Sequence, residues 1–437
     1  MRFFHLSDLH LGKTLHGYDL LDDQAYVLER VVAKVGELRP EVLLIAGDIY
    51  DRAIPPVEAI QLFDAFLGAA RRAAPGLRIV VVSGNHDSAG RLSFGASLLA
   101  DSGLRIVTKA EGSPTLVAGE GSERVTVWAL PFLTQSSADW EDLAVAEGGA
   151  GGLGKAVDGG NAGGGAVGRG VGGKGGVGSE PAGRLASITR IRPQQELMRL
   201  AIAPIRAAMD PGSANVLVAH CFASGAIAGD SELAFVGAAE QVDTGFFEGF
   251  DYVALGHLHS GQSPAPHVWY CGAPLAYSVG EAGAEKSFLS VEVLAGKTPR
   301  IEPISIAPKR QVRRLKGFFD ELVANPLPEA ERDDYIEVYL CDDEPVLNAG
   351  ERLKALYPRL LGAPQRAFEL RWGAAGNGDD ALDALRRARG GSDAPDRLET
   401  AKGDFRAFHR EMTGDGPSEA MIELFEAMAE EASDASD

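Results

Sequence analysis

Five short polar motifs, each directly after an apolar run, restrict the fold of this chain more than any other feature of its sequence. They are Asp8-Leu9-His10, Gly47-Asp48, Gly84-Asn85-His86-Asp87, Ala219-His220 and Gly256-His257-Leu258-His259. The apolar runs before them have the length and the Val, Ile and Leu content of buried strands. In sheets with helical crossovers, ligands bind at the carboxyl ends of the strands, so one crevice can collect all five motifs.

The sequence around these motifs predicts an α/β fold. Its β-rich runs alternate with amphipathic stretches, as in βαβ units around a buried sheet. The expected strands are Arg2–Leu6, Val42–Ala46, Ile79–Val82, Val125–Leu130, Asn215–Ala219, Tyr252–Leu255 and Ser287–Leu294. Helices are expected at Leu20–Leu38, Val57–Arg72 and Ile188–Met209, and the first two carry apolar residues at the spacing of helices that cover a sheet.

A glycine-rich stretch interrupts the first of three expected domains, which spans residues 1–302. Glycine makes up 18 of the 37 residues from 147 to 183. Such a segment buries too little apolar surface to offset the conformational entropy that it would lose on ordering. The stretch has neither a collagen period nor a phosphate-loop signature. We therefore expect a flexible surface insertion that does not bind nucleotides.

The pattern of the chain changes after residue 302. A helix is expected at Phe318–Val323, a strand at Tyr335–Leu340, a helix at Ala349–Leu356 and a strand at Ala367–Arg371. These elements predict a small α+β capping domain over residues 303–375. Residues 376–437 are expected to form a linker and C-terminal helices, because apolar residues recur there at helical spacing. The helices either pack within the small domain or dock onto a partner.

Composition restricts the class of protein. The 437 residues are 45% apolar and 24% charged, as in soluble globular proteins. No apolar run reaches the roughly 20 residues of a membrane span, and the N-terminus lacks a signal-peptide pattern, so a cytoplasmic protein without a membrane partner is expected. The three scattered cysteines, Cys221, Cys271 and Cys341, fit a reducing compartment. A net charge of −20 argues against a protein that coats DNA by electrostatics alone.

The motifs contain the donors of a metal centre. Alternate residues of an extended segment point the same way, so Asp8 with His10, and His257 with His259, are each expected to offer two ligands to one centre. Carboxylate, imidazole and amide donors without thiolate favour a hard to borderline ion such as Mn²⁺, with Mg²⁺ as the alternative. The seven candidate ligands are Asp8, His10, Asp48, Asn85, His220, His257 and His259. They suffice for two ions if Asp48 bridges them.

Such a pair of ions fits phosphodiester hydrolysis. Two ions polarise the phosphodiester, lower the pKa of the attacking water and stabilise the leaving oxygen. Their charge also explains how an acidic protein holds a phosphate. His86 is the candidate general acid for the departing alkoxide, because it follows the ligand Asn85 and points elsewhere. Asp51 is expected to orient that imidazole and raise its pKa.

A structural role is the ordinary explanation for any one histidine near a strand end. Five of the nine histidines of this chain nevertheless lie in the motifs, each next to an apolar run. Chance placement is a poor explanation for that concentration. The other four, His5, His16, His267 and His409, have no such setting, and we interpret them as structural.

The order of the motifs, D-x-H, G-D, G-N-H-D, H and G-H-x-H, resembles that of the calcineurin-like metallophosphoesterase superfamily. The segments FFHLSDLHLGK, LLIAGDIYDRAIPP, VVVSGNHDS, VALGHLHSGQ and YCGAPLAYSVGE are similar to those of the bacterial SbcD exonuclease family, related to the archaeal and eukaryotic double-strand-break repair nuclease. The resemblance implies a β-sandwich flanked by helices, a small α+β capping domain and a helical C-terminal tail.

The resemblance also implies a role for each site residue. The matches of Asp8, His10 and His259 hold one manganese ion in the family, and those of Asn85, His220 and His257 hold the other. Asp48 matches the bridging ligand, and His86 matches the histidine that protonates the leaving group. The archaeal relatives carry a histidine where this chain has Asp51, and the glycine-rich insertion is foreign to the family pattern.

The implied activity is 3′ to 5′ exonuclease and endonuclease cleavage of DNA ends and hairpins. The implied partner is an SbcC-like ATPase whose coiled coil binds near the C-terminus. By position, Val57–Leu67 and Leu92–Leu99 resemble the helices through which the family forms homodimers; covering the sheet is their other interpretation.

Two other functions remain open on the sequence. One is a metallophosphoesterase acting on a non-DNA phosphodiester or phosphomonoester, although the added capping domain and tail exceed the needs of a small-substrate hydrolase. The other is a non-catalytic scaffold with a phosphoesterase fold. Such scaffolds lose metal ligands or the catalytic histidine, and here all are present.

Overall fold

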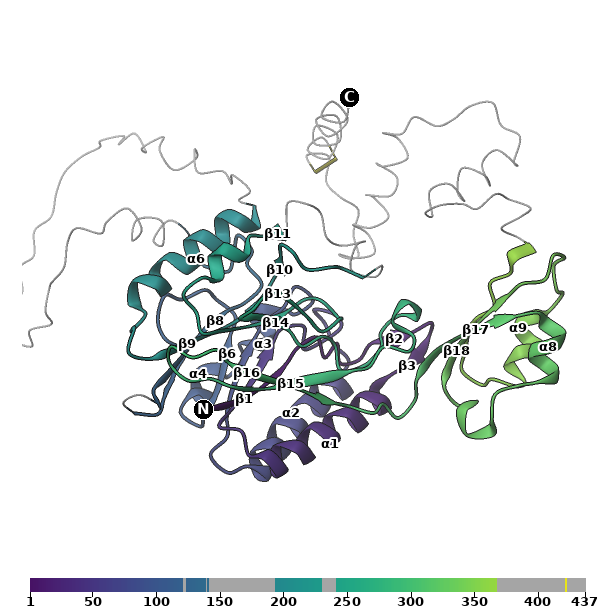
Figure 1. The fold of residues 1–437 in the computed structure, drawn as a ribbon, viewed down its shortest axis with the longest axis horizontal. Coiled ribbons are helices and arrows are strands. Elements are labelled where there is room, and N and C mark those ends of the chain that lie inside the picture. The colour runs from purple at the N-terminus through teal and green to yellow at the C-terminus, as the bar shows by residue number, and fades with distance from the viewer. Residues whose placement is uncertain (121–122, 139, 141–192, 230–240, 368–420, 423–437) are drawn as a thin grey trace, which may run out of the picture. The chain divides into compact units, whose positions relative to one another are not determined.

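The computed structural model describes residues 1–120, 123–138, 140, 193–229, 241–367 and 421–422 (Figure 1). The chain divides into two compact units, Met1–Leu340 with Asn348–Pro364, and Cys341–Leu347 with Gln365–Asp437. The glycine-rich insertion lies outside the described residues. So do the predicted C-terminal helices, apart from Met421 and Ile422, which are helical.

A six-stranded sheet with the order β16-β15-β1-β4-β5-β6 forms one half of the first unit. Its strands are β1 (Arg2–Leu6), β4 (Val42–Ala46), β5 (Arg78–Val82), β6 (Leu104–Val107), β15 (Ser287–Glu292) and β16 (Arg300–Ser305). The strands β1, β4, β5 and β6 run parallel, whereas β15 and β16 pair antiparallel. The carboxyl ends of β1, β4 and β5 therefore share one edge of the sheet.

A second six-stranded sheet has the order β13-β14-β12-β9-β8-β7. Its strands are β7 (Leu116–Ala118), β8 (Val125–Leu130), β9 (Ala214–His220), β12 (Tyr252–Gly256), β13 (Gln262–Ala265) and β14 (Val268–Tyr270). The strands β8, β9, β12 and β14 run parallel, and antiparallel strands close both edges. The carboxyl ends of β9 and β12 therefore also lie side by side.

The two sheets pack face to face, and helices cover their outer faces (Figure 1). The helices are α1 (Leu21–Leu38) and α2 (Val57–Ala73) on the first sheet, and α6 (Gln194–Ala208) on the second. Along β4, Leu43 packs with the helix layer, whereas Leu44 belongs to the buried cluster between the sheets, together with Val216 and Val218. Both faces of the central strands are thus buried, which explains their uninterrupted apolar sequence.

Shorter elements connect these layers. They are β2 (Thr14–Leu15), β3 (Tyr18–Asp19), α3 (Ala89–Leu92), α4 (Ala96–Ala100), β10 (Phe222–Ala223), β11 (Gln241–Val242) and the 3₁₀ turns η3 (Thr244–Phe247), η4 (Val279–Glu281) and η5 (Glu329–Glu331).

A three-stranded parallel sheet, β17-β18-β19, follows in the sequence. Its elements are β17 (Val312–Gly317), α8 (Phe319–Ala324), β18 (Tyr335–Leu340), α9 (Ala349–Lys354) and β19 (Leu360–Gly362). The predicted helices and the strand at 335–340 are present. The strand predicted at 367–371 lies outside the described residues except for Ala367, which is helical.

The α/β fold class is confirmed. The observed bounds of β1, β4 and β8 equal the predicted ones, and the predicted helices over residues 20–38 and 57–72 appear as α1 and α2. The first sheet continues to Ser305 through β16, three residues past the predicted boundary at 302.

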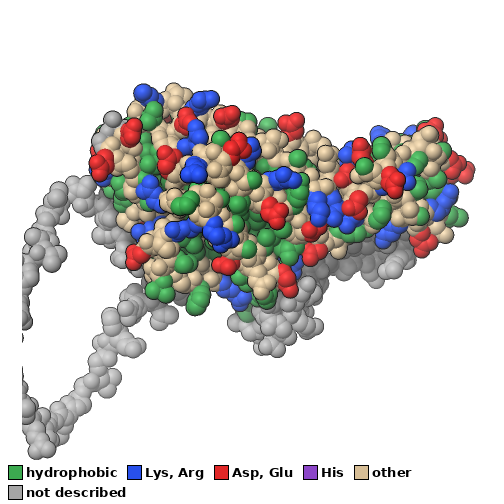
Figure 2. All heavy atoms as spheres, turned by 90° about the horizontal axis from the view of Figure 1, so that it is seen from below, with side chains coloured by type: hydrophobic (Ala, Val, Ile, Leu, Met, Phe, Trp, Pro, Cys, Tyr) green, Lys and Arg blue, Asp and Glu red, His purple; other side chains and the backbone are tan. Residues whose placement is uncertain are grey.

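The surface mixes charges of both signs. On the face shown in Figure 2, Lys and Arg side chains alternate with Asp and Glu and do not gather into one basic stripe. None of the helices in the described part of the chain has the length and apolar character needed to cross a bilayer.

One histidine lies in the core, where it joins β1 to β12. The His5 ring is fully buried, with Nδ1 2.9 Å from the Tyr252 hydroxyl and Nε2 3.1 Å from the backbone oxygen of Leu255. Burial lowers the pKa of His5 to about 3, because the interior disfavours the charged ring. His5 is thus structural, as interpreted from the sequence.

This buried neutral histidine makes the fold sensitive to acid. The unfolded chain binds a proton at His5 below its ordinary pKa of 6.5, whereas the folded chain does so only near pH 3. Stability contributed by His5 is therefore present above pH 6.5 and is lost as the pH falls toward 3, by about 1.4 kcal/mol per pH unit. We expect urea unfolding of the EDTA-treated protein to show this extra slope between pH 6.5 and 4.5, and His5→Gln to lack it. Equal slopes in both proteins would contradict the assignment.

Candidate metal centre

The five motifs follow β1, β4, β5, β9 and β12, and the structure brings their side chains into one cluster. Two sets of possible ligand atoms lie within 4.8 Å of one another: those of Asp8, Asp48 and His220, and those of His10, Asp48 and His86. Asp48 belongs to both sets. The remaining candidates Asn85, His257 and His259 contact members of these sets, so none of the seven predicted ligands lies elsewhere.

Three donors meet on one side of Asp48. The Oδ1 atom of Asn85 lies 2.9 Å from His220 Nε2 and 3.0 Å from His257 Nδ1, and these two nitrogens are 3.3 Å apart. Ligand atoms about 2.1 Å from an octahedral ion are separated by roughly 3 Å. The trio therefore has the spacing of three ligands around one cation.

The tautomer of His220 supports this interpretation. Its Nδ1 lies 2.8 Å from the backbone oxygen of Ala46, which can only accept, so Nδ1 carries the hydrogen. In the neutral ring, Nε2 then presents a lone pair toward the Asn85 oxygen, another acceptor. Burial lowers the pKa of His220, but the charge of Asp48 outweighs this and raises it to about 9. The charge of Asp48 therefore favours a cation at this nitrogen, whether a proton or a metal ion.

Two further donors meet on the other side of Asp48. The Nε2 atoms of His10 and His259 are 3.1 Å apart. The Oδ2 atom of Asp48 lies 3.7 Å from His10 Nε2 and 3.5 Å from His220 Nε2. One carboxylate oxygen therefore stands between the two groups of imidazoles, where a bridging ligand is required.

Carboxylates in this cluster are buried. Burial raises the pKa of Asp8 to about 6, and burial together with the charge of Asp48 raises that of Asp87 to about 6. Burial also raises the pKa of Asp48, but His220 and His10 outweigh it and hold that pKa well below its usual range. Asp48 is thus an anion in a desolvated place, which favours a bound cation.

The backbone at the strand ends is not extended. The predicted pairing of Asp8 with His10 and of His257 with His259 assumed extended segments, and that assumption is wrong. Asp8, His10, Asp48 and His257 all have positive φ values of 53°, 42°, 47° and 117°. Such conformations cost of order 1–3 kcal/mol each in non-glycine residues and cluster at functional sites. Backbone hydrogen bonds hold them here, from Asp8 N to Gly47 O and from His10 N to Asp48 O.

The motif glycines make room for the ligands. A Cβ atom on Gly84 would lie 2.1 Å from Asp48 Oδ1, and one on Gly47 would lie 2.2 Å from His220 Nδ1. On Gly256 it would lie 1.8 Å from the backbone oxygen of Ala46. Any larger residue would displace a donor or separate the strands that carry it.

His86 stands at the open side of the cluster. It is half-buried, its N–H donates to Asp48 Oδ1 at 2.9 Å, and its ring meets the His10 ring edge-on at 4.9 Å. The predicted contact with Asp51 differs in detail. His86 Nδ1 lies 2.8 Å from the backbone oxygen of Asp51, whereas the Asp51 carboxylate pairs with Lys13 at 2.7 Å. The ammonium of Lys13 draws the carboxylate away from the ring.

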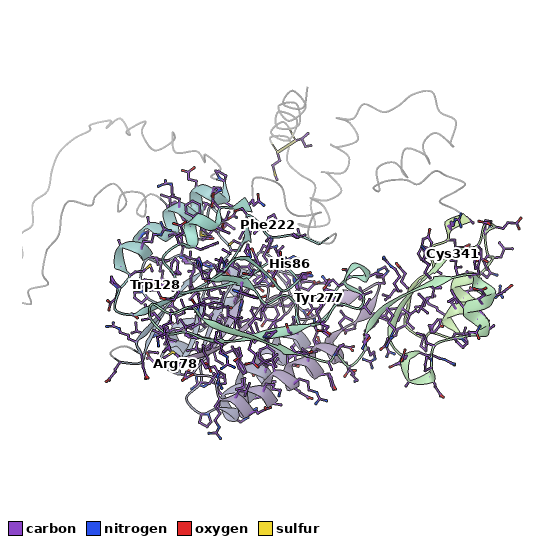
Figure 3. The ribbon with its side chains drawn as sticks, viewed as in Figure 1. Arg78, His86, Trp128, Phe222, Tyr277 and Cys341 are labelled. Atoms are coloured by element: carbon purple, nitrogen blue, oxygen red, sulfur yellow. The ribbon has the colours of Figure 1, made fainter. Side chains whose placement is uncertain are left out.

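Three residues without a predicted role hold the cluster in place. The Asp87 carboxylate accepts hydrogen bonds from the backbone of Gly84, Ile49 and Tyr50 and so joins two motifs. The Tyr277 hydroxyl donates to the backbone oxygen of Leu9, and its ring lies edge-on to His10. Glu281 contacts His259. Figure 3 labels the side chains of His86 and Tyr277, whose rings both lie edge-on to His10. The two residues are far apart in the sequence, so the spacing of the motifs did not predict that they share this neighbour.

Comparison with known proteins finds two family models and similar solved structures. The family model described as Calcineurin-like phosphoesterase matches residues 1–261, which contain all five motifs. The SbcD C-terminal model, described as Type 5 capsule protein repressor C-terminal domain, matches residues 308–389. Among solved structures, the chain is similar to a dimetal phosphatase from Danio rerio, at 14% identity over 72% of this chain and 98% of that chain, with a TM-score of 0.36.

The close approach of Gly84 to Asp48 can be tested by metal binding. In Gly84→Ala the added methyl group displaces Asp48, so we expect Mn²⁺ affinity to fall by roughly tenfold or more in isothermal titration. Gly90→Ala is the matched control, because a Cβ there meets no atom within 4 Å. Equal affinity of the two variants would show that Asp48 is not a ligand.

Proposed function

Because the chain belongs to the calcineurin-like phosphoesterase family, we propose that it is a two-metal phosphodiesterase that processes DNA ends. The observation that carries the proposal is the meeting of two donor groups at the buried carboxylate of Asp48, with His86 beside them. The match of residues 308–389 to an SbcD C-terminal domain supports DNA as the substrate class.

In this proposal Asp8, His10 and His259 hold one ion, Asn85, His220 and His257 hold the other, and Asp48 bridges them. Mn²⁺ is the proposed metal, with Mg²⁺ as the alternative, because the donors are oxygen and imidazole. When bound, the ions polarise the phosphodiester and lower the pKa of the attacking water.

The chain itself supplies the proton for the leaving oxygen. His86 Nδ1 keeps its hydrogen because it faces a carbonyl oxygen, so the proton that passes to the leaving oxygen is the one that the protonated ring carries on Nε2. The hydrogen bond from His86 N to Asp48 Oδ1 fixes the distance between this acid and the bridging carboxylate. Asp51 contributes its backbone oxygen, which fixes the orientation of the ring.

The partner is proposed from the same comparison. An SbcC-like ATPase would bind the C-terminal part of the chain and help to hold DNA, which a chain of net charge −20 does not attract by itself. Cleavage of DNA ends and hairpins, with 3′ to 5′ exonuclease polarity, is the proposed activity of that complex. The proposed location of the complex is the cytoplasm, a reducing compartment in which the three cysteines of the chain stay free thiols.

Because His86 is the proposed acid and Asp48 a proposed metal ligand, their substitutions should lower the activity for different reasons. We expect His86→Ala to bind two Mn²⁺ ions but to hydrolyse a blunt linear duplex roughly 10²- to 10⁴-fold more slowly, because it lacks the proton donor. Asp48→Ala is expected to lose bound metal itself. Metal analysis and a nuclease assay, with a generic phosphodiester dye as second substrate, separate the two variants.

His267→Ala is the control, since that histidine contacts the backbone of Phe247 away from the cluster. A fully active His86→Ala protein would remove the general acid. Hydrolysis of the dye without cleavage of DNA, even with the ATPase partner added, would favour a phosphodiesterase with another substrate.

A second copy of the chain is the proposed occupant of an apolar surface beside α2. Phe94 and Leu98 are 90% and 83% exposed, and Val57 and Ile60 on α2 are 63% and 46% exposed. A groove of about 620 Å³ runs between these segments. Exposed apolar surface of this kind is typical of an interface, and the family resemblance supports a homodimer as the proposal.

This interface predicts a charge-sensitive dimer. We expect Phe94→Glu to convert the dimer to a monomer in analytical ultracentrifugation, because the carboxylate cannot be buried unpaired. Hydrolysis of the dye is expected to stay within about twofold, since the substitution lies outside the metal cluster. Leu347→Glu is the matched control at another apolar residue, 81% exposed. A wild-type monomer at micromolar concentration would remove the proposal.

A further inference from the structure

A buried ion pair contacts His259 at two places. Lys286 Nζ lies 2.5 Å from Glu281 Oε2 and 3.1 Å from the backbone oxygen of His259. Glu281 Oε1 lies 3.4 Å from His259 Nδ1. The side chains of Glu281 and Lys286 are only 11% and 6% exposed. The pair therefore fixes both the backbone and the imidazole of His259.

The contact with Glu281 sets the tautomer of His259. One oxygen of the Glu281 carboxylate faces the ammonium of Lys286 and the other faces His259 Nδ1, and a carboxylate only accepts, so Nδ1 carries the hydrogen. The lone pair of His259 then lies on Nε2, the nitrogen that faces His10 Nε2 at 3.1 Å. A carboxylate behind a histidine is the usual arrangement that orients a metal ligand.

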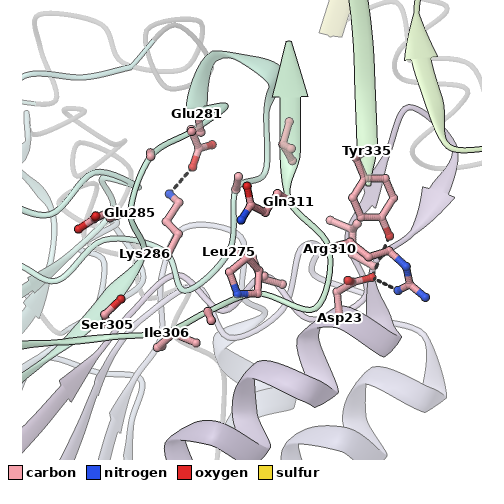
Figure 4. A pocket seen from close by; sticks show the side chains of 17 residues that line it. Asp23, Leu275, Glu281, Glu285, Lys286, Ser305, Ile306, Arg310, Gln311 and Tyr335 are labelled. Atoms are coloured by element: carbon pink, nitrogen blue, oxygen red, sulfur yellow. Dashed lines mark hydrogen bonds and ion pairs between the residues drawn. The ribbon is translucent and has the colours of Figure 1, made fainter. Parts of the chain in front are cut away.

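Glu281 is itself held by its neighbours. Its Oε1 also lies 3.2 Å from the backbone nitrogen of Tyr277 and 3.1 Å from Ser278 Oγ. The pair forms one wall of a cavity of about 220 Å³, and Asp23, Arg310 and Tyr335 lie on the opposite side (Figure 4). Although the pair borders open space there, the bonds from Tyr277, Ser278 and Lys286 together keep Glu281 turned toward His259.

The ligands of the other proposed ion do not depend on this pair. His220 is oriented by the backbone oxygen of Ala46, and His257 Nδ1 lies 3.0 Å from the Asn85 oxygen. A defect in the pair should therefore affect one ion and spare the other.

We propose that Glu281 and Lys286 are positioning residues that orient His259 toward the ion it shares with His10. This inference rests on the proposed two-metal function. Loss of a carboxylate behind a metal-ligating histidine lowers metal affinity by about 10- to 100-fold in other proteins. The same loss is expected here, at one ion only.

The test is a titration of Mn²⁺ into the EDTA-treated full chain by isothermal calorimetry. The wild-type protein is expected to bind two ions, and Glu281→Gln to bind one with unchanged affinity and the other about 10- to 100-fold more weakly. The Mn²⁺ concentration for half-maximal hydrolysis of the dye should rise by the same factor, while the rate at saturating Mn²⁺ stays close to wild type. A purely structural defect would lower that rate without selecting one ion.

Glu285→Gln is the matched control, because Glu285 lines the same cavity but is exposed and belongs to the same loop. The double variant Glu281→Gln, Lys286→Met leaves no unpaired buried ammonium and replaces the single variant if circular dichroism shows that Glu281→Gln unfolds. Wild-type affinity for both ions, or equal weakening of both, would overturn the inference. Binding of fewer than two ions by the wild-type chain would instead overturn the proposed function.

Discussion

The carboxylate of Asp48 is the interaction on which the rest of the site depends. It is buried, anionic and held in a left-handed backbone conformation at the end of β4, between two groups of imidazoles. A carboxylate in such a place is costly unless cations or hydrogen bonds compensate it. The backbone N–H of His86 supplies one hydrogen bond, and the histidines on both sides supply the remaining partners.

The sandwich supplies this arrangement because each of its sheets contains parallel strands whose carboxyl ends meet at one edge. His220 at the end of β9 reaches from the second sheet to the backbone of Ala46 in the first. Gly47 and Gly256 leave the space that this crossing needs. The donor cluster therefore forms only when the two sheets pack together, and a substitution that alters the sheet packing also moves the donors.

Much of the fold could be predicted from the sequence, because strands buried on both faces, such as β4 and β8, appear as continuous apolar runs. The three-residue strand β19 carries no such pattern and was missed. The donor residues were predicted because their chemical types are unusual in these positions. The roles of Asp87 and Glu281 were not, because their contacts join segments whose distance in space no local spacing encodes. Nor does a sequence show that Asp8 or Asp48 adopts a positive φ.

Two cations sharing Asp48 are the central claim, and anomalous diffraction from crystals soaked in Mn²⁺ tests it most directly. The geometry predicts two anomalous peaks about 3.5–4 Å apart, as in other two-metal sites. One peak should lie next to His10 and His259 and the other next to Asn85, His220 and His257, with Asp48 between them. A single peak, or peaks that do not contact Asp48, would contradict the two-metal centre.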